Sequence, residues 1–132
     1  MHYQIRKGWP SEAALDELFP LEAGADIDTL EGKVLKVGET GIAKEAESIA
    51  AGDIYGFCFA AEDVNKKAAL LMSDAIIEVD STLYEAGTYT VGTAVGVKNG
   101  KFDSASATYA VARVINYDAI SGKLRLMWFS VK

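Results

Sequence analysis

The sequence has very few of the residues that cross-link a domain or serve in catalysis: one cysteine, one histidine and two prolines among 132 residues. The single cysteine, Cys58, excludes an intramolecular disulfide and a cysteine-based zinc cluster. Because it lies in the apolar run GFCFA, it is predicted to be a buried small hydrophobe and not a nucleophile. The single histidine, His2, lies at a terminus that is expected to fray, which nearly excludes a histidine-based triad or metal site.

Clustered basic residues and long apolar stretches are also missing. The formal net charge is −6, with 13 Lys and Arg scattered among 19 Asp and Glu, so no nucleic-acid partner is expected. No stretch approaches the ~18 uninterrupted apolar residues of a membrane span, and MHYQIRKGWP lacks the apolar core of a signal peptide. The sequence therefore predicts a soluble protein with no membrane segment, made in a reducing compartment.

What the sequence does contain is a series of short apolar runs separated by turn residues, at a spacing of roughly ten residues. In the last run, KLRLMWFSV, Leu124 and Trp128 share one side of a strand while Arg125 and Met127 share the other. Both sides carry apolar residues, so this strand is expected to be central or covered on both faces. The pattern predicts a mainly β fold of about seven to nine strands, a small antiparallel barrel or sandwich, with residues 21–132 as a single β domain.

The glycine-rich stretch GTAVGVKNGKF, residues 92–102, raises the question of a phosphate-binding loop. Such a loop needs Gly, four residues, then Gly-Lys-Ser/Thr at a helix start, but valine replaces its first glycine here and phenylalanine replaces its Ser or Thr. The pair Asn99-Gly100 between two short arms is instead the strongest short-range signal for a type I′ hairpin. The tip is expected to be exposed, so that Lys98, Asn99 and Lys101 can contact a neighbouring protein.

Carboxylates are numerous but do not form a recognisable motif. Asp26, Asp28 and Glu31 suggest a calcium loop, yet the fifth position is Leu30 and the glycine comes one residue late, so a solvated acidic loop is preferred. A glycosidase needs two carboxylates across a cleft, and the sequence leaves such a pair open. No metal and no cofactor is predicted, and the chain is expected not to be an enzyme.

The first 20 residues differ from the rest and are interpreted as an N-terminal arm. Within the arm, SEAALDELF is predicted to form a short helix that Pro20 ends. Two interpretations stay open: the apolar residues of the arm fold back onto one end of the β domain, or they grip a partner as aromatic anchors do in protein interfaces. These residues are Trp9, Leu15, Leu18 and Phe19.

The chain resembles the small capsid decoration, or cement, proteins of tailed bacteriophages. The stretches that carry the likeness are ADIDTLEGKVLKV, AAGDIYGFCFAAEDV, YEAGTYTVGTAVGV and AVARVINYDAISGKLRLMWF. Proteins of this kind are short, acidic, rich in β structure and poor in cysteine, often with an N-terminal arm that lies on the shell. The likeness is one of overall style from about residue 20 to the end, and it brings no catalytic residues.

The resemblance implies a structural protein on the capsid exterior of the virion, synthesised in the host cytoplasm. It would bind the outer capsid surface, bridge neighbouring subunits of the major capsid protein and form a homo-oligomer, with a trimer favoured. Alternatives are another head or tail component of the same particle, a small carbohydrate-binding β-sandwich that uses exposed Tyr or Trp, and a hydrolase with a carboxylate pair. The residues expected to bind a partner are Trp9, Leu15, Leu18, Phe19, Lys98, Asn99 and Lys101.

Overall fold

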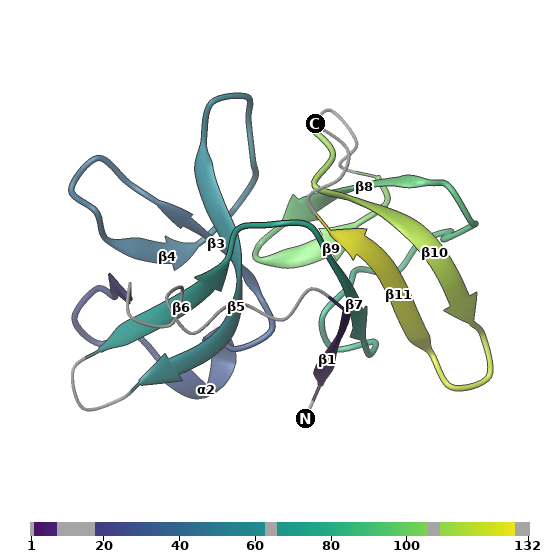
Figure 1. The fold of residues 1–132 in the computed structure, drawn as a ribbon, viewed down its shortest axis with the longest axis horizontal. Helices are drawn as coiled ribbons and strands as arrows, with labels where there is room; N and C mark the ends of the chain where they lie inside the picture. Colours follow the sequence, from purple (N-terminus) through teal and green to yellow (C-terminus); the bar gives the residue numbers. More distant parts are fainter. Residues whose placement is uncertain (1, 8–17, 63–65, 106–108, 129–132) are drawn as a thin grey trace.

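The computed structural model describes residues 2–7, 18–62, 66–105 and 109–128, which form two antiparallel sheets with little helix (Figure 1). The five-stranded sheet has the order β2 (Phe19–Pro20), β6 (Lys67–Leu71), β5 (Ile54–Glu62), β3 (Val34–Val37) and β4 (Ala43–Glu45). The six-stranded sheet has the order β1 (Tyr3–Lys7), β7 (Ala75–Val79), β11 (Lys123–Trp128), β10 (Ala112–Asp118), β8 (Ala94–Lys98) and β9 (Lys101–Asp103). The mainly β prediction is confirmed; within the described part neither sheet closes on itself, which favours the sandwich over the barrel.

The two sheets pack on each other through alternate residues of their strands. In the five-stranded sheet Phe57 points toward the other sheet, and in the six-stranded sheet Leu126 and Trp128 point back. The Trp128 indole nitrogen donates a hydrogen bond to the carbonyl of Leu71, at 3.1 Å, which ties the last strand to β6. We call the buried residues that the two sheets place between them the large core. Its largest fully buried side chains include Trp128, Phe57, Phe102, Leu71, Ile77, Leu124 and Leu126.

The five-stranded sheet also buries its second face, in what we call the small core. Leu35 and Cys58 alternate with large-core residues of β3 and β5, and both are fully buried. The one-turn helix α2 (Ile27–Leu30) contributes Leu30 to this core, and the Asp26 side chain caps the helix by accepting from the Asp28 amide. The buried members are Leu21, Leu30, Leu35, Ala43, Cys58, Ala68 and Leu70.

Two parts of the predicted N-terminal arm are strands of these sheets. Residues 3–7 form β1, which pairs with β7 and places Ile5, 4% exposed, in the large core. Phe19 pairs with Ala68 of β6, so the prediction that Phe19 belongs to a helix is wrong. Pro20 fits this place because β2 is an edge strand, where a missing N–H leaves no ladder bond unmade. Leu18, the other described residue of the predicted helix, is not helical either, and residues 11–17 lie outside the described residues.

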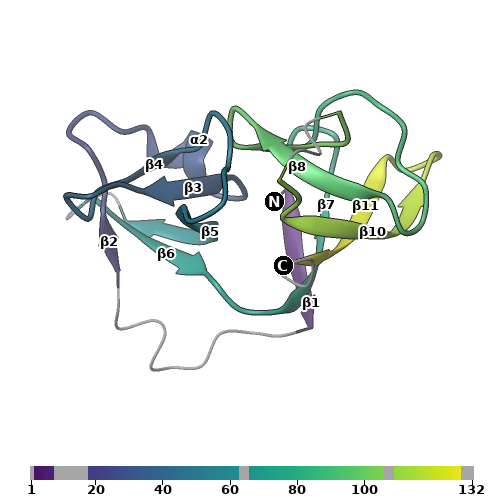
Figure 2. The same ribbon diagram turned by 90° about the horizontal axis from the view of Figure 1, so that it is seen from above.

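The sheets lie side by side along the longest axis, with the five-stranded sheet in one half of the molecule and the six-stranded sheet in the other (Figures 1 and 2). The chain passes between the halves after β1 and again between β6 and β7. Both ends of the chain therefore contribute to the six-stranded half, since β1 and β11 flank β7. The five-stranded half is built from the continuous stretch between Phe19 and Leu71.

Candidate functional site

The predicted hairpin at Asn99-Gly100 is confirmed. Asn99 has φ 51° and Gly100 has φ 78°, as a type I′ turn requires at its two central positions. Lys98 and Lys101 are paired across the turn, and β8 and β9 form its arms. The glycine-rich stretch is therefore the turn of a hairpin, and a strand, β9, follows it where a phosphate-binding loop would have the start of a helix.

The sequence predicts an exposed tip for this hairpin. In the structure the backbone of the tip is instead hydrogen-bonded to the chain's own five-stranded half. The amide of Asn99 donates to the Glu47 carbonyl at 3.1 Å, and the amide of Gly100 donates to the Ala46 carbonyl at 2.6 Å. The Val34 amide in turn donates to the Gly100 carbonyl at 2.8 Å. Gly100 is buried, and a Cβ there would lie 2.7 Å from Cγ of Glu45. The backbone of the tip joins the two halves.

The side chains around the turn differ in what they offer a partner. Lys98 and Asn99 are exposed, whereas Lys101 is half-buried. Three backbone hydrogen bonds fix the turn, so the two exposed side chains extend from a backbone that is held in place. Because this backbone is already ordered, a partner that binds here loses less conformational entropy.

The predicted aromatic anchors are only partly accounted for. Trp9 and Leu15 lie outside the described residues. Leu18 is half-buried, and Phe19 is half-buried against the small core. In both ribbon views β2 lies at the far end of the five-stranded half from the hairpin (Figures 1 and 2). The structure therefore does not bring Phe19 together with Lys98 and its neighbours.

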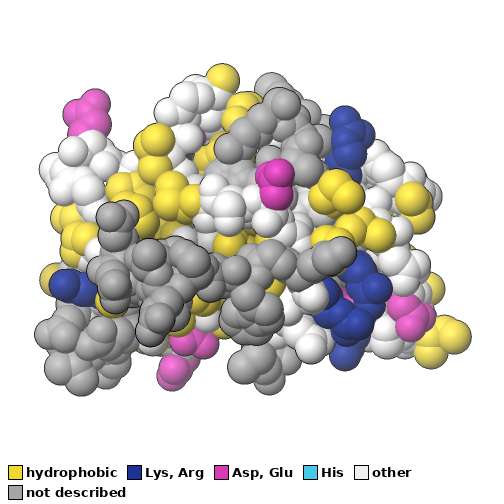
Figure 3. All heavy atoms as spheres, in the orientation of Figure 1, with side chains coloured by type: hydrophobic (Ala, Val, Ile, Leu, Met, Phe, Trp, Pro, Cys, Tyr) yellow, Lys and Arg dark blue, Asp and Glu magenta, His cyan; other side chains and the backbone are white. Residues whose placement is uncertain are grey.

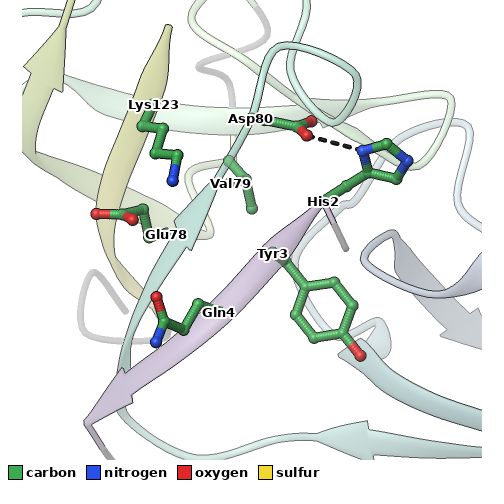
Figure 4. A pocket seen from close by; sticks show the side chains of 7 residues that line it. All are labelled: His2, Tyr3, Gln4, Glu78, Val79, Asp80 and Lys123. Atoms are coloured by element: carbon green, nitrogen blue, oxygen red, sulfur yellow. Dashed lines mark hydrogen bonds and ion pairs between the residues drawn. The ribbon is translucent and has the colours of Figure 1, made fainter. Parts of the chain in front are cut away.

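A shallow pocket of about 270 Å³ lies where β1 runs beside β7 (Figure 4). His2 Nδ1 lies 2.7 Å from Asp80 Oδ2, and Asp80 also accepts hydrogen bonds from the amide and hydroxyl of Thr82. Desolvation raises the pKa of Asp80, but the hydrogen bonds from Thr82 and His2 outweigh it and hold that pKa below its ordinary value. The Asp80 carboxylate therefore holds His2, the residue before β1, in place. The pocket is lined by His2, Tyr3, Gln4, Glu78, Val79, Asp80 and Lys123.

The outward side of the six-stranded sheet carries a second arrangement, which we call the outer face. Ile76 on β7, Met127 on β11 and Arg113 on β10 lie side by side in one row across three strands. The next row holds Glu78 and Arg125. Met127 is 42% exposed although its neighbours in sequence are fully buried. This face is open among the described residues, so of the two places expected for the last strand, central or covered on both faces, β11 takes the first: it lies between β7 and β10.

The outer face is predominantly positive. Arg125 donates to Glu78 Oε2 at 3.0 Å and 3.3 Å, and Arg6 lies 3.8 Å from the other oxygen of the same carboxylate. Arg113, which is exposed, donates to the Gly92 carbonyl at 2.9 Å. In the space-filling view, Lys and Arg side chains gather around one acidic side chain over the strands β7 and β11 (Figure 3). One carboxylate is shared by two arginines, which leaves net positive charge beside exposed Met127.

The predicted burial of Cys58 is confirmed. Its side chain is fully buried in the small core, and burial, assisted by the negative charge of Glu31, raises the pKa of the thiol to about 12. Burial likewise raises the pKa of Tyr3 to about 12, and its hydroxyl donates to the carbonyl of Phe59. At neutral pH the Cys58 thiol stays protonated, in the setting that makes a cysteine chemically inert.

The described residues show neither a metal-binding cluster nor a helix that spans a membrane. They hold no group of three or more His, Cys, Asp or Glu side chains placed to bind a metal ion. None of their helices is long and apolar enough to cross a membrane.

The sequence did not identify the outer face, although its signal was present. Arg125 and Met127 alternate with buried residues, and this alternation places them on one side of a strand. The sequence could not assign Arg6 to this face, because the strand state of residues 3–7 depends on pairing with β7, whose residues 76–79 lie far along the chain. The outer face is therefore assembled by long-range pairing that local patterns do not encode.

Comparison with known proteins adds no relative from which a role could be transferred. No protein-family model, no curated protein and no solved structure matches this chain.

Proposed function

We propose that this chain is a non-enzymatic structural protein of a virus particle, which binds the outer capsid surface and bridges major capsid subunits. The observation that supports this role best is the rigidly mounted hairpin tip. Exposed Lys98 and Asn99 stand on a turn that three backbone hydrogen bonds attach to the five-stranded half. A cement protein needs such preorganised contacts, since flexible ones would lose binding free energy to ordering.

The remainder of the fold suits a rigid bridging body. Two sheets share a large core, and the five-stranded sheet has a small core on its second face. A body of this kind transmits force between contacts at different points of its surface, because closely packed interiors deform little. We further propose a homo-oligomer, with a trimer favoured, since several modest contacts per assembly multiply by avidity.

The proposal predicts a major capsid gene among the neighbouring genes, and it is tested by co-sedimentation with empty shells assembled from the product of that gene. The wild-type chain is expected to sediment with the shells at a fixed ratio. Lys98→Glu is expected to reduce bound protein at least about five-fold at limiting concentration, because loss of one contact is multiplied across an oligomer. The matched control is Lys67→Glu, which reverses the charge of another exposed lysine, on β6.

If Lys98→Glu and Lys67→Glu reduce shell binding equally, the hairpin has no specific role in it. Absence of wild-type binding would contradict the capsid role itself.

The predicted arm is tested in the same assay with Trp9→Ala. We expect weaker attachment with a melting temperature within about 2 °C of wild type, since a Trp that anchors a partner adds little to the fold. A drop of several degrees would place Trp9 in the core instead.

A carbohydrate-binding sandwich is a second candidate, favoured by one observation. Tyr117 is 37% exposed and lies edge-on to Tyr84, with ring centroids 6.2 Å apart. The Tyr84 hydroxyl donates to the Gly122 carbonyl at 2.6 Å, so the aromatic pair is held in place beside the loop after β10. A glycan array tests this function: binding that Tyr117→Ala removes would support it, and an array without signal would exclude it for the sugars displayed.

A further inference from the structure

The charges of this chain are separated between its two halves. Residues 18–74, which contain the five-stranded sheet, hold eleven Asp and Glu against five Lys and Arg, a net charge of −6. Residues 2–7 and 75–128, which contain the six-stranded sheet, hold five Asp and Glu against seven Lys and Arg, a net charge of +2. An acidic protein thus has a positive half, and the positive charge of that half includes the outer face.

The outer face presents its charge in a form suited to a protein partner. Arg113 and Lys123 are exposed, and Met127 beside Arg113 supplies apolar surface. Two carboxylates lie beside the basic residues of this face: Glu78 binds two arginines, and Asp118 is paired with Lys123 across β10 and β11. Arginine next to exposed apolar side chains is the composition typical of protein interfaces.

The five-stranded half carries a complementary feature, a groove of about 230 Å³ between α2 and β4 that we call the acidic groove. Its charged lining residues are Glu22, Asp26, Glu45 and one base, Lys44. Glu45 binds Lys33 at 3.0 Å, but within the described residues neither Glu22 nor Asp26 forms an ion pair. Asp28, which is exposed in the first turn of α2, adds a further carboxylate two residues after Asp26.

We propose that copies of this chain associate head to tail, with the outer face of one copy seated on the acidic groove of the next. Positive and negative surfaces on the same chain attract each other between copies, whereas like surfaces facing each other would repel. Because the two surfaces lie in different halves of the molecule, the contact is heterologous, and it generates a closed ring or an open filament. This contact rests on the homo-oligomer proposed above and specifies its geometry; it is tested without shells, so that its failure is distinguishable from failure of capsid binding.

The association is expected to depend strongly on salt. Exposed charges interact over a Debye length of about 10 Å at 0.1 M ionic strength and about 3 Å at 1 M. An interface of about 800 Å² on each partner, the size of an ordinary stable contact, would take about a tenth of the chain's 7213 Å² surface. We therefore expect species larger than the 14.1 kDa monomer in sedimentation velocity at low salt, and mostly monomer at 1 M salt.

Paired neutralising variants test the two surfaces separately. The outer-face variant is Arg113→Ser with Lys123→Ser, and the groove variant is Glu22→Ser with Asp28→Ser. Each alone is expected to raise the Kd for self-association at least about ten-fold.

The matched control is Lys36→Ser with Lys67→Ser, which removes the same charge from the five-stranded half. Its loss of the pair between Lys36 and Asp53, 3.3 Å apart, affects stability little because surface pairs contribute little. The control is expected to associate at least as well as wild type, since it makes the five-stranded half more negative.

Mixing the outer-face variant with the groove variant is the decisive measurement. Each retains one intact surface, so the mixture is expected to form a one-to-one dimer of about twice 14.1 kDa that cannot extend further. Wild-type protein that stays monomeric at low salt and about 100 μM, far above a micromolar Kd, would overturn the proposal. So would association that the control lowers as much as the two variants do. Variants that self-associate alone and form no mixed dimer would replace the head-to-tail contact with a symmetric one.

Discussion

The large core and the small core are built in different ways, although they share the five-stranded sheet. The large core joins residues from Ile5 to Trp128, and its centre is aromatic. The small core draws on residues 21–70, and its largest fully buried side chain is Leu35. Strand β5 separates the two, with Phe57 on one side and Cys58 on the other. The large core thus depends on long-range pairing, and the small core on a continuous stretch of chain with a one-turn helix over it.

This difference predicts unequal stability. Aromatic rings in the large core contact one another edge-on. The ring centroid of Trp128 lies 5.8 Å from that of Tyr55 and 6.0 Å from that of Phe102. Such contacts stabilise the fold beyond the contribution of buried apolar area. The small core is covered by a helix of four residues, too short to be stable without packing. We expect the small core to open locally while the large core remains closed, and each prediction below bears on that expectation.

The largest effect is expected from Trp128→Ala. The change leaves a cavity among Tyr55, Phe57 and Phe102 and removes the hydrogen bond to the Leu71 carbonyl. The free energy of unfolding is expected to fall by about 3–5 kcal/mol, measured by urea denaturation. Trp128→Phe serves as the control, and its free energy of unfolding should fall less because the variant keeps an aromatic ring. If both variants lose under about 1 kcal/mol, the large core is not the centre of stability.

The corresponding change in the small core is Leu30→Ala, expected to lower the free energy of unfolding by about 2 kcal/mol. Leu30 lies on α2 at the edge of this core, 6% exposed, so the surroundings can relax into part of the cavity. Thr29→Ala, on the exposed side of the same helix, is the control and should change stability little. A loss in Leu30→Ala equal to that in Trp128→Ala would mean that the two cores unfold as one unit.

Local pattern predicted the parts of the fold whose apolar residues alternate in sequence. The alternation of side chains in KLRLMWFSV predicts a strand, whose described part is β11, and the preference of Asn99 and Gly100 for positive φ predicts the turn. The strand state of residues 3–7 and of Phe19 was missed. Each of these segments is held by a partner strand distant in sequence, which local patterns do not reveal.

Exposure proved harder to predict than strand position. The sequence placed Lys98 and Asn99 at a turn but could not show that Glu47 and Ala46 accept hydrogen bonds from its backbone. It also placed Met127 on one side of a strand without showing whether that side was covered. A strand pattern fixes which residues share a face, and only the packing of distant segments decides whether the face meets solvent.

A smaller effect is expected from pH, and it reports on the small core. Burial and the charge of Glu31 raise the pKa of Cys58 from 9.0 to about 12 on folding, so only the unfolded chain ionises the thiol in that interval. This contribution to stability is fully present below pH 9 and is lost as the pH rises toward 12. Between pH 9 and 10 the free energy of unfolding should fall by about 1 kcal/mol on this account. Cys58→Ala should lack that part of the loss, measured by urea denaturation at each pH.

The thiol also measures local opening directly. A thiol reagent should label native Cys58 slowly at pH 8, and faster than global unfolding allows, because opening of the small core alone exposes it. Leu30→Ala should accelerate labelling by about the factor that its loss of stability predicts, roughly 30-fold for 2 kcal/mol. Trp128→Phe should accelerate it less. Labelling that follows global unfolding in every variant would show that the small core has no independent opening.

The smallest effect is expected where neither core is involved. Ile120, in the loop between β10 and β11, is 99% exposed, and Ile120→Ser should change the free energy of unfolding by less than about 0.5 kcal/mol. The loop keeps its shape without this side chain, because Asp118 Oδ1 accepts the Ile120 amide at 2.9 Å and the Asp118 carbonyl accepts from Gly122 at 2.7 Å. Asp118→Ala, which removes the first of these bonds, is the comparison and should cost more. If Ile120→Ser instead weakens self-association or shell binding at unchanged stability, this isoleucine belongs to a contact surface beyond the outer face and the hairpin.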